Sequence, residues 1–290
     1  MKHLFCFGMG YSAAALACRL ADGWKVTGTY RSQEAKASLA AAGYGQVPFD
    51  GSAALPPGAL DEVTHLVSSI PPGKDGDPVL TSCTTQIVRH AGHIEWAGYL
   101  STTGVYGDRA GGWVDETSEL TPSTERGRRR LEAESGWLAL HTKHGLPVHL
   151  FRLAGIYGPG RNQLESVRKG TARRVIKPGQ VFSRIHVDDI SGVLAASIDR
   201  PDPGTAYNVC DDEAAPPQDV VAHAAELLKV DAPPEVDFEA AEMSPMGRSF
   251  YAESKRVSNE RIKHDLGYEL IYPSYREGLK ALLQSETIEH

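Results

Sequence analysis

The feature that most constrains the fold of this chain is a glycine-rich turn close to its start. Residues 2–7 are mostly apolar and are expected to form a strand. The turn that follows reads Gly8-Met9-Gly10-Tyr11-Ser12-Ala13 and leads into a helical run. The first glycine permits a tight turn, the second lets a phosphate approach the backbone, and the small third residue lets the helix pack on the strand. This order predicts a Rossmann-type unit that binds a dinucleotide at the helix amino terminus.

The end of the second expected strand, Trp24 to Tyr30, bears on which dinucleotide would bind. Chains that prefer NAD usually carry Asp or Glu there, and its carboxylate binds the ribose 2′-hydroxyl. This chain continues as Tyr30-Arg31-Ser32 and has no carboxylate before Glu34. A charge-assisted bond from Arg31 to a 2′-phosphate would contribute about 1.5–3 kcal/mol. The sequence therefore favours NADP(H) over NAD(H), and the alternative is that Arg31 is a plain solvated residue.

Strands and helices continue to alternate through the first half of the chain. Further strands are expected at residues 46–49, 62–70, 95–101 and 147–153, separated by helical runs. This alternation predicts an α/β fold with a doubly wound parallel sheet, in which ligands bind at the carboxyl ends of the strands. Additional cofactor-binding candidates at that edge are Asp50, Ser68, Ser69 and Pro71. Asp50 also suits a plain turn role, because it begins a Gly-Ser loop.

The composition limits the kind of partner. The 290 residues are 41% hydrophobic and carry a net charge of −7, which argues against nucleic acid or an anionic membrane surface. No segment reaches the roughly 20 apolar residues of a membrane span. The four cysteines are far apart, which is typical of a reduced, cytoplasmic chain without a disulfide or metal site. We expect a small-molecule ligand, and leave open whether two copies form a homodimer.

Residues 101–134 read STTGVYGDRAGGWVDETSELTPSTERGRRRLEAE. This stretch resembles the catalytic segment of the extended short-chain dehydrogenase/reductase family, the NAD-dependent epimerases and dehydratases. The resemblance gives Thr102 the role of binding the reacting oxygen, whereas the family's Tyr-x-x-x-Lys pair falls on Arg126 and Arg130. Further similar runs are Phe151 to Arg161, Arg184 to Ile190, Tyr207 to Val209 and Lys255 to Asn259. The chain thus resembles the atypical branch that lacks the pair.

The two arginines change the chemistry that the resemblance implies. Arginine stays protonated at neutral pH, so neither Arg126 nor Arg130 can donate the proton. Spaced i, i+4 on a helix expected over Pro122 to Leu140, both should point into the cleft, Arg130 towards the ribose and Arg126 towards the substrate. Candidates for a relocated acid are Tyr106 and Tyr157, although both belong to Tyr-Gly turns with a structural role. Alternatively, the arginine run is a solvated helix start that pairs with nearby glutamates.

The resemblance implies an NADP(H)-binding, epimerase- or dehydratase-like oxidoreductase for a hydroxyl-bearing, anionic, nucleotide-sugar-like metabolite. The alternative is a non-catalytic NADP(H)-binding redox sensor or regulator. We expect a Rossmann domain over residues 1–158, with 184–209 returning to it, and a small substrate lobe over 159–183 and 210–290. We also expect Asp189 to cap a helix over 190–198, residues 235–253 to form a flap, and the tail after Leu283 to be disordered.

Overall fold

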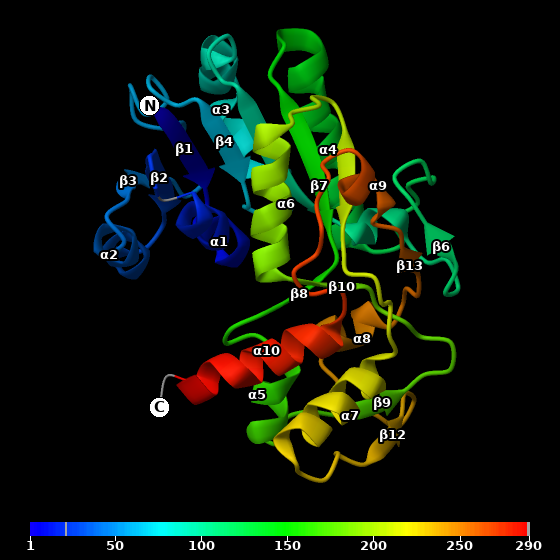
Figure 1. The fold of residues 1–290 in the computed structure, drawn as a ribbon. Coiled ribbons are helices and arrows are strands. Elements are labelled where there is room, and N and C mark those ends of the chain that lie inside the picture. Colours follow the sequence, from blue (N-terminus) through cyan, green and yellow to red (C-terminus); the bar gives the residue numbers. More distant parts are fainter. Residues whose placement is uncertain (21, 289–290) are drawn as a thin grey trace.

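The centre of the molecule is a seven-stranded sheet in which every pairing is parallel (Figure 1). The computed structural model describes residues 1–20 and 22–288. The strand order is β11-β7-β5-β4-β1-β2-β3. The strands are β1 (Lys2–Phe7), β2 (Trp24–Tyr30), β3 (Gly45–Pro48), β4 (His65–Ser68), β5 (Trp96–Thr102), β7 (Val148–Leu153) and β11 (Ala206–Val209). The order reverses direction between β1 and β4, which confirms the predicted doubly wound, Rossmann-type sheet.

Helices cover both faces of this sheet (Figure 1). They are α1 (Tyr11–Arg19), α2 (Gln33–Ala41), α3 (Pro78–His90), α4 (Glu125–His144) and α6 (Val187–Asp199). On β1, Leu4 and Cys6 belong to one apolar core and Phe5 and Phe7 to another, because successive side chains of a strand point to opposite faces. α1 packs against α6, and α3 packs against α4. Within the described ranges, no helix combines the length and apolar character that crossing a membrane requires.

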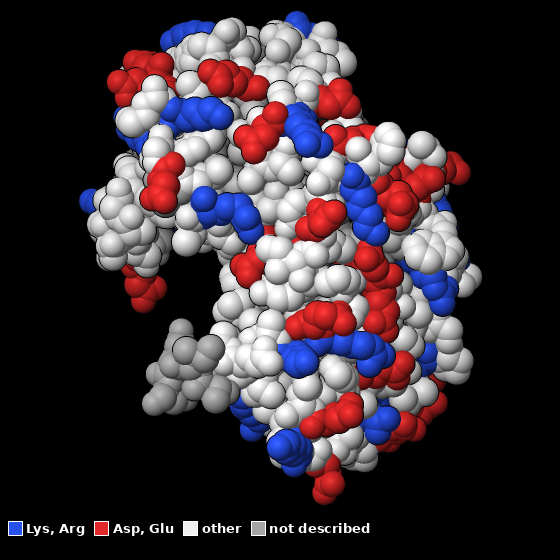
Figure 2. All heavy atoms as spheres, in the orientation of Figure 1, with Lys and Arg blue, Asp and Glu red and all other residues white. Residues whose placement is uncertain are grey.

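A smaller lobe lies at the end of the sheet where the parallel strands finish (Figure 1). Its elements are α5 (Gln163–Arg168), β9 (Arg174–Ile176), α7 (Pro217–Leu228), β12 (Glu235–Asp237), α8 (Pro245–Phe250) and α10 (Tyr275–Ile288). A third apolar cluster, which includes Leu164, Val220 and Leu279, holds the lobe together. Figure 2 shows the surface hollowed between this lobe and the sheet-bearing part.

Short elements connect the two parts. They are η1 (Thr103–Tyr106), β6 (Trp113–Val114), β8 (Gly155–Tyr157), β10 (Arg184–His186), β13 (Arg256–Val257) and α9 (Glu260–His264). β8 pairs with β10, and β6 pairs with β13, in both cases in parallel. The second pairing attaches the segment after α8 to the loop that precedes α4.

Several expected boundaries differ in the structure. Helix α4 begins at Glu125 rather than Pro122, because the Thr124 hydroxyl accepts the amide N–H of Gly127 and caps the first turn. Residues 235–253 are not an irregular flap throughout, since β12 and α8 lie within them. The tail expected to be disordered after Leu283 continues as helix α10 to Ile288, and residues 289–290 lie outside the described residues.

The expected capping role of Asp189 is wrong. His186 precedes the first turn of α6, and its ring Nδ1 accepts the Asp188 amide N–H at 3.2 Å. The buried Asp189 carboxylate instead accepts the Tyr268 hydroxyl at 2.9 Å and the Ile271 amide at 2.7 Å. Asp189 therefore fastens the segment before α10 to α6, which is a long-range role that local sequence does not reveal.

Candidate functional site

The glycine turn has the geometry of a phosphate cradle. Gly8 has a φ of 80°, and a Cβ there would lie 2.8 Å from Ile70 Cγ1, so both conformation and space require glycine. Its amide donates to Thr29 Oγ1 at 2.7 Å, and its carbonyl accepts Ser69 Oγ at 2.7 Å. Gly10 precedes α1 and provides no side-chain cap, which leaves the first N–H groups of the helix open to an anion. This turn fits the pyrophosphate of a dinucleotide.

The other residues of the glycine turn, Met9 and Tyr11 to Ala13, anchor the turn through hydrogen bonds and apolar packing. Tyr11 lines the cleft described below and donates its hydroxyl to the Pro159 carbonyl at 2.9 Å. Ser12 and Ala13 are buried in the first turn of α1, which is the packing expected for a small third residue of the motif. Met9 is half-buried and packs against the apolar core, with its Cε close to Gly28.

The residues expected around the adenosine half lie at the carboxyl end of β2. Tyr30 is half-buried, and Arg31 and Ser32 are exposed, with the Ser32 hydroxyl capping α2 through the Ala35 amide at 3.2 Å. Asp50 is exposed and accepts the Ser52 amide and hydroxyl, which lowers the pKa of the Asp50 carboxyl. Asp50 therefore has the turn role that the sequence left open.

The other residues expected at the carboxyl edge of the sheet, Ser68, Ser69 and Pro71, differ in their exposure. Ser69 lines the cleft and bonds to the glycine turn. Ser68 is buried in β4, and Pro71 is exposed in the following loop. Among these three candidates, only Ser69 lines the cleft.

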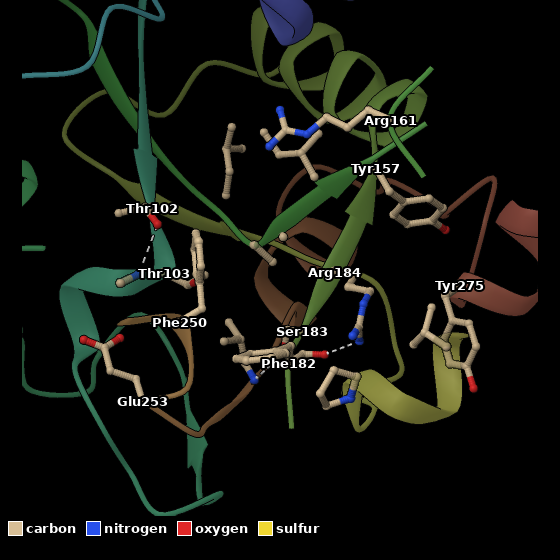
Figure 3. Close-up of a pocket in the computed structure, with 18 of the residues that line it drawn as sticks. Thr102, Thr103, Tyr157, Arg161, Phe182, Ser183, Arg184, Phe250, Glu253 and Tyr275 are labelled. Carbon is tan, nitrogen blue, oxygen red and sulfur yellow. Dashed lines mark hydrogen bonds between the residues drawn. The ribbon is translucent and has the colours of Figure 1, made fainter. Parts of the chain in front are cut away.

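The cleft has a volume of about 1170 Å³ and lies between the sheet and the lobe. Figure 3 shows Thr102 and Thr103 on one side of it and Arg184 and Tyr275 on the other. Its charged lining residues are six cations and two carboxylates: Arg126, Arg130, Arg161, Lys169, Arg184, Lys255, Glu165 and Glu253. The chain as a whole carries a net charge of −7, so the cleft is basic in an otherwise acidic protein.

Thr102, Arg126 and Arg130 lie together on the sheet side of the cleft. Thr102 ends β5, and its hydroxyl accepts the Gly104 amide at 3.2 Å. Arg130 donates to the Leu100 carbonyl, so its guanidinium is held against the end of the same strand. Arg126, one turn earlier on α4, stacks on the Phe250 ring at 4.8 Å from the ring centroid. Both arginines thus face the cleft.

The remaining arginines of the run behave differently. Arg128 and Arg129 form ion pairs with Glu125 at 2.9 Å and 3.1 Å. The hypothesis that the arginine run is a solvated helix start paired with glutamates therefore holds for Arg128 and Arg129. It does not hold for Arg126 or Arg130.

The two tyrosines considered as relocated acids occupy different environments. Tyr106 is fully buried outside the cleft lining, where its hydroxyl donates to Asn208 Oδ1 at 2.7 Å and accepts from Arg152 Nη1 at 2.9 Å. Burial raises the pKa of Tyr106 to about 12. This position does not suit a proton donor for a ligand in the cleft, because the hydroxyl cannot reach one.

Tyr157 lines the cleft, but its hydroxyl is directed into the lobe. It donates to the Ser274 carbonyl at 3.3 Å, and Figure 3 places the ring far from Thr102. Burial, reinforced by the Asp211 carboxylate, raises the pKa of Tyr157 above its usual range. Tyr157 therefore remains a lining residue on the wall opposite Thr102.

A carboxylate and an ammonium group that the sequence analysis did not select lie beside Arg126. Glu253 accepts Ser123 Oγ at 2.6 Å and Lys255 Nζ at 2.7 Å, and Lys255 also donates to the Gly107 carbonyl at 2.8 Å. Both side chains are about nine-tenths buried, at 11% and 10% exposure, and both line the cleft. The pair can hold and pass a proton. Lys255 begins one of the runs that resemble the family, which was the available signal.

Comparison with known proteins assigns the family. No protein-family model matches the chain. Protein YeeZ of Escherichia coli K12 is 30% identical over 285 residues, 94% of this chain and 97% of YeeZ. A conserved protein of unknown function from Silicibacter pomeroyi is 52% identical, with a TM-score of 0.91 over 99% of each chain. A proposed NAD-dependent epimerase/dehydratase from Methylobacillus flagellatus is 27% identical, with a TM-score of 0.72 over 99% of this chain and 98% of the other.

The chain belongs to the same family as YeeZ, and it shares its Rossmann fold with NAD-dependent epimerase/dehydratase proteins. The fold of this family extends to more distant sequences. A human epimerase family protein in complex with NADPH is 17% identical, with a TM-score of 0.76 over 98% of this chain and 99% of that one. Residues 1–20 and 22–288 contain no group of three or more His, Cys, Asp and Glu side chains suited to a metal ion.

Proposed function

We propose that this protein is an NADP(H)-dependent oxidoreductase of the epimerase/dehydratase kind that acts on a hydroxyl-bearing, anionic, nucleotide-sugar-like metabolite. The observation that carries the proposal is one cleft that contains the phosphate turn, Thr102 and a large excess of cations. An acidic protein that gathers cations around a single cleft favours an anionic ligand. The complete substrate lobe supports an enzyme over a sensor. The lobe closes the cleft on the side opposite the sheet, and a dinucleotide sensor does not require it.

A nicotinamide cofactor is supported by the glycine cradle and by the NADPH bound to a human protein of the same fold. When bound, the cofactor supplies or accepts a hydride. Gly8, Gly10 and Ser69 would hold its pyrophosphate, Arg31 its 2′-phosphate and Arg130 its nicotinamide ribose. Preference for NADP(H) rests on Arg31, which is exposed at the end of β2 and has no acidic neighbour before Glu34.

Replacement of Arg31 by Ala should weaken NADPH binding by roughly tenfold to a hundredfold and leave NADH binding almost unchanged. The reason is that only NADPH carries the 2′-phosphate with which Arg31 can form a charge-assisted bond. Nicotinamide fluorescence titrations of both cofactors measure this effect. Lys36→Ala removes an exposed charge one turn into α2 and serves as the matched control. Equal weakening of NADPH and NADH would reject the assignment of Arg31.

The chain's own residues divide the remaining work. Thr102 orients the reacting oxygen at the end of β5. Glu253, held by Ser123 and Lys255, accepts the hydroxyl proton as a hydride leaves the carbon, and returns that proton in the reverse direction. This pair replaces the tyrosine whose position is Arg126.

Single-turnover mixing of the NADPH-loaded protein with nucleotide sugars and carbonyl metabolites tests the reaction. Thr102→Ala and Glu253→Gln should each reduce turnover by about 10²–10⁴-fold without changing NADPH affinity, the usual contribution of acid–base catalysis. Ser118→Ala, a change at a half-buried position outside the cleft lining, is the control. Tight NADPH binding with no oxidation by any compound would instead favour a redox sensor. Unchanged turnover in both variants would remove their assigned roles.

A further inference from the structure

Two neighbouring arginines in the cleft have no carboxylate to balance them. Arg126 and Arg130 are one turn apart on α4, and neither forms an ion pair anywhere in the described part of the chain. The Glu253 carboxylate acts on the charge of Arg126 but forms no ion pair with it, and it is bonded instead to Ser123 and Lys255. Like charges one helical turn apart repel each other, so the bare pair is unfavourable without an anion.

The protonation of Arg126 reflects this environment. The cleft walls partly desolvate the guanidinium, and the charge of Arg130 acts in the same direction, so the pKa of Arg126 is lowered despite an opposing effect of Glu253. The two arginines are not equivalent as ligands. Arg130 is already bonded to the Leu100 carbonyl, whereas Arg126 contacts the Phe250 ring and has no hydrogen bond within residues 1–20 and 22–288. Arg126 is therefore the guanidinium that is free to bind.

The position of Arg126 relative to the sheet indicates which end of a ligand it would contact. Dinucleotides bind across the reversal of strand order, here between β1 and β4. Arg31 lies at the end of β2, on one side of that reversal, and Thr102 at the end of β5, on the other. If the proposed function holds, the adenosine half lies towards Arg31 and the reacting half towards Thr102. Gly127, next to Arg126, packs so closely on the Gly104 carbonyl that a Cβ there would lie 2.8 Å from it. This contact places Arg126 close to Thr102, so its anion belongs to the reacting end of the substrate.

We propose that Arg126 binds a carboxylate on the carbon adjacent to the one that reacts, so that the substrate is a 2-hydroxy or 2-oxo acid at its reacting end. The guanidinium edge offers parallel N–H groups to a planar carboxylate, while Phe250 covers one face of the group. The nearby Glu253 carboxylate disfavours a doubly charged phosphate at the same position. This assignment rests on the proposed function only for the location of the reacting end.

Calorimetric titration with oxamate tests the site without requiring turnover, because oxamate resembles a 2-oxo acid and is not readily reduced. The full-length protein is titrated with and without NADPH, and oxamide serves as the neutral counterpart. Oxamate should bind about tenfold or more tightly than oxamide, and Arg126→Gln should weaken oxamate by a similar factor, as expected for a charged hydrogen bond. Arg128→Gln, which removes an equal charge from the same helix, should change oxamate affinity less than about twofold.

The outcomes separate this site from the proposed function. Loss of oxamate binding in Arg126→Gln, with NADPH affinity and circular dichroism unchanged, supports the carboxylate site even if no compound oxidises NADPH. The proposal is overturned if wild-type protein does not bind oxamate, if oxamide binds equally well, or if Arg126→Gln binds oxamate like the wild type. Tighter binding of inorganic phosphate than of oxamate would also overturn it, because the site would then select a phosphate.

Discussion

Replacement of Arg152 by Met is expected to lower the free energy of unfolding by about 3–5 kcal/mol, because it leaves the Glu134 carboxylate buried without its counter-charge. The two side chains are 6% and 2% exposed. Arg152 Nη2 donates to Glu134 Oε2 at 2.9 Å and Arg152 Nε to Oε1 at 3.2 Å. Ser101 Oγ adds a third bond to Oε1 at 2.5 Å. Urea unfolding followed by circular dichroism measures the loss.

Two further variants separate the buried charge from other effects. Arg128→Met breaks an exposed pair with Glu125 and should change the free energy of unfolding by less than about 1 kcal/mol. The double variant Arg152→Met with Glu134→Leu should recover part of the loss, because no buried charge remains. Near-wild-type stability of Arg152→Met alone would contradict the argument.

This network also bears on the site. Glu134 lies one turn beyond Arg130 on α4, and Ser101 precedes Thr102 on β5. The buried pair therefore fixes the helix that carries both cleft arginines against the strand that carries Thr102. We expect variants of Arg152 to disturb ligand binding as well as stability.

Lowering the pH from 6.5 to 4 is expected to reduce the free energy of unfolding by about 3 kcal/mol for each of two buried histidines. Burial lowers the pKa of His65 to about 4, with a smaller contribution from Lys2, and burial lowers the pKa of His149 to about 4. In the unfolded chain both titrate near 6.5. Between these values the unfolded state binds more protons than the folded state, so stability is lost as the pH falls.

The His149→Phe variant isolates one of these contributions. His149 is fully buried on β7 and stacks on Trp96 with ring centroids 5.8 Å apart, so Phe can occupy its place. The pH dependence of the free energy of unfolding should become less steep by up to about 1.4 kcal/mol per pH unit below pH 6.5. His264→Phe changes an exposed ring and should leave the slope unaltered. An unchanged slope in His149→Phe would show that this ring titrates normally.

Local patterns in the sequence were sufficient for the glycine turn and for the fold. The glycine turn requires a positive φ at Gly8 and has little space for a side chain there. Both requirements can be recognised in the sequence, because they call for glycine at a fixed place between a strand and a helix. The parallel sheet follows from apolar strands spaced by helical runs. The i, i+4 spacing of Arg126 and Arg130 was enough to predict that both line one cleft, because helical periodicity is a local property.

Only the tertiary structure decided which groups gather around that cleft. Lys255 reaches the carbonyl of Gly107 across 148 positions of sequence, and Glu253 reaches Ser123 across 130. Tyr106 and Tyr157 belong to similar Tyr-Gly turns, yet their environments differ. The Tyr106 hydroxyl is buried and bonded to Asn208, whereas the Tyr157 hydroxyl is directed into the lobe. Such contacts depend on how distant segments pack and on which groups packing removes from water. Neither property is encoded in the spacing of neighbouring residues, so the sequence alone could not show that Glu253 and Lys255 line the cleft.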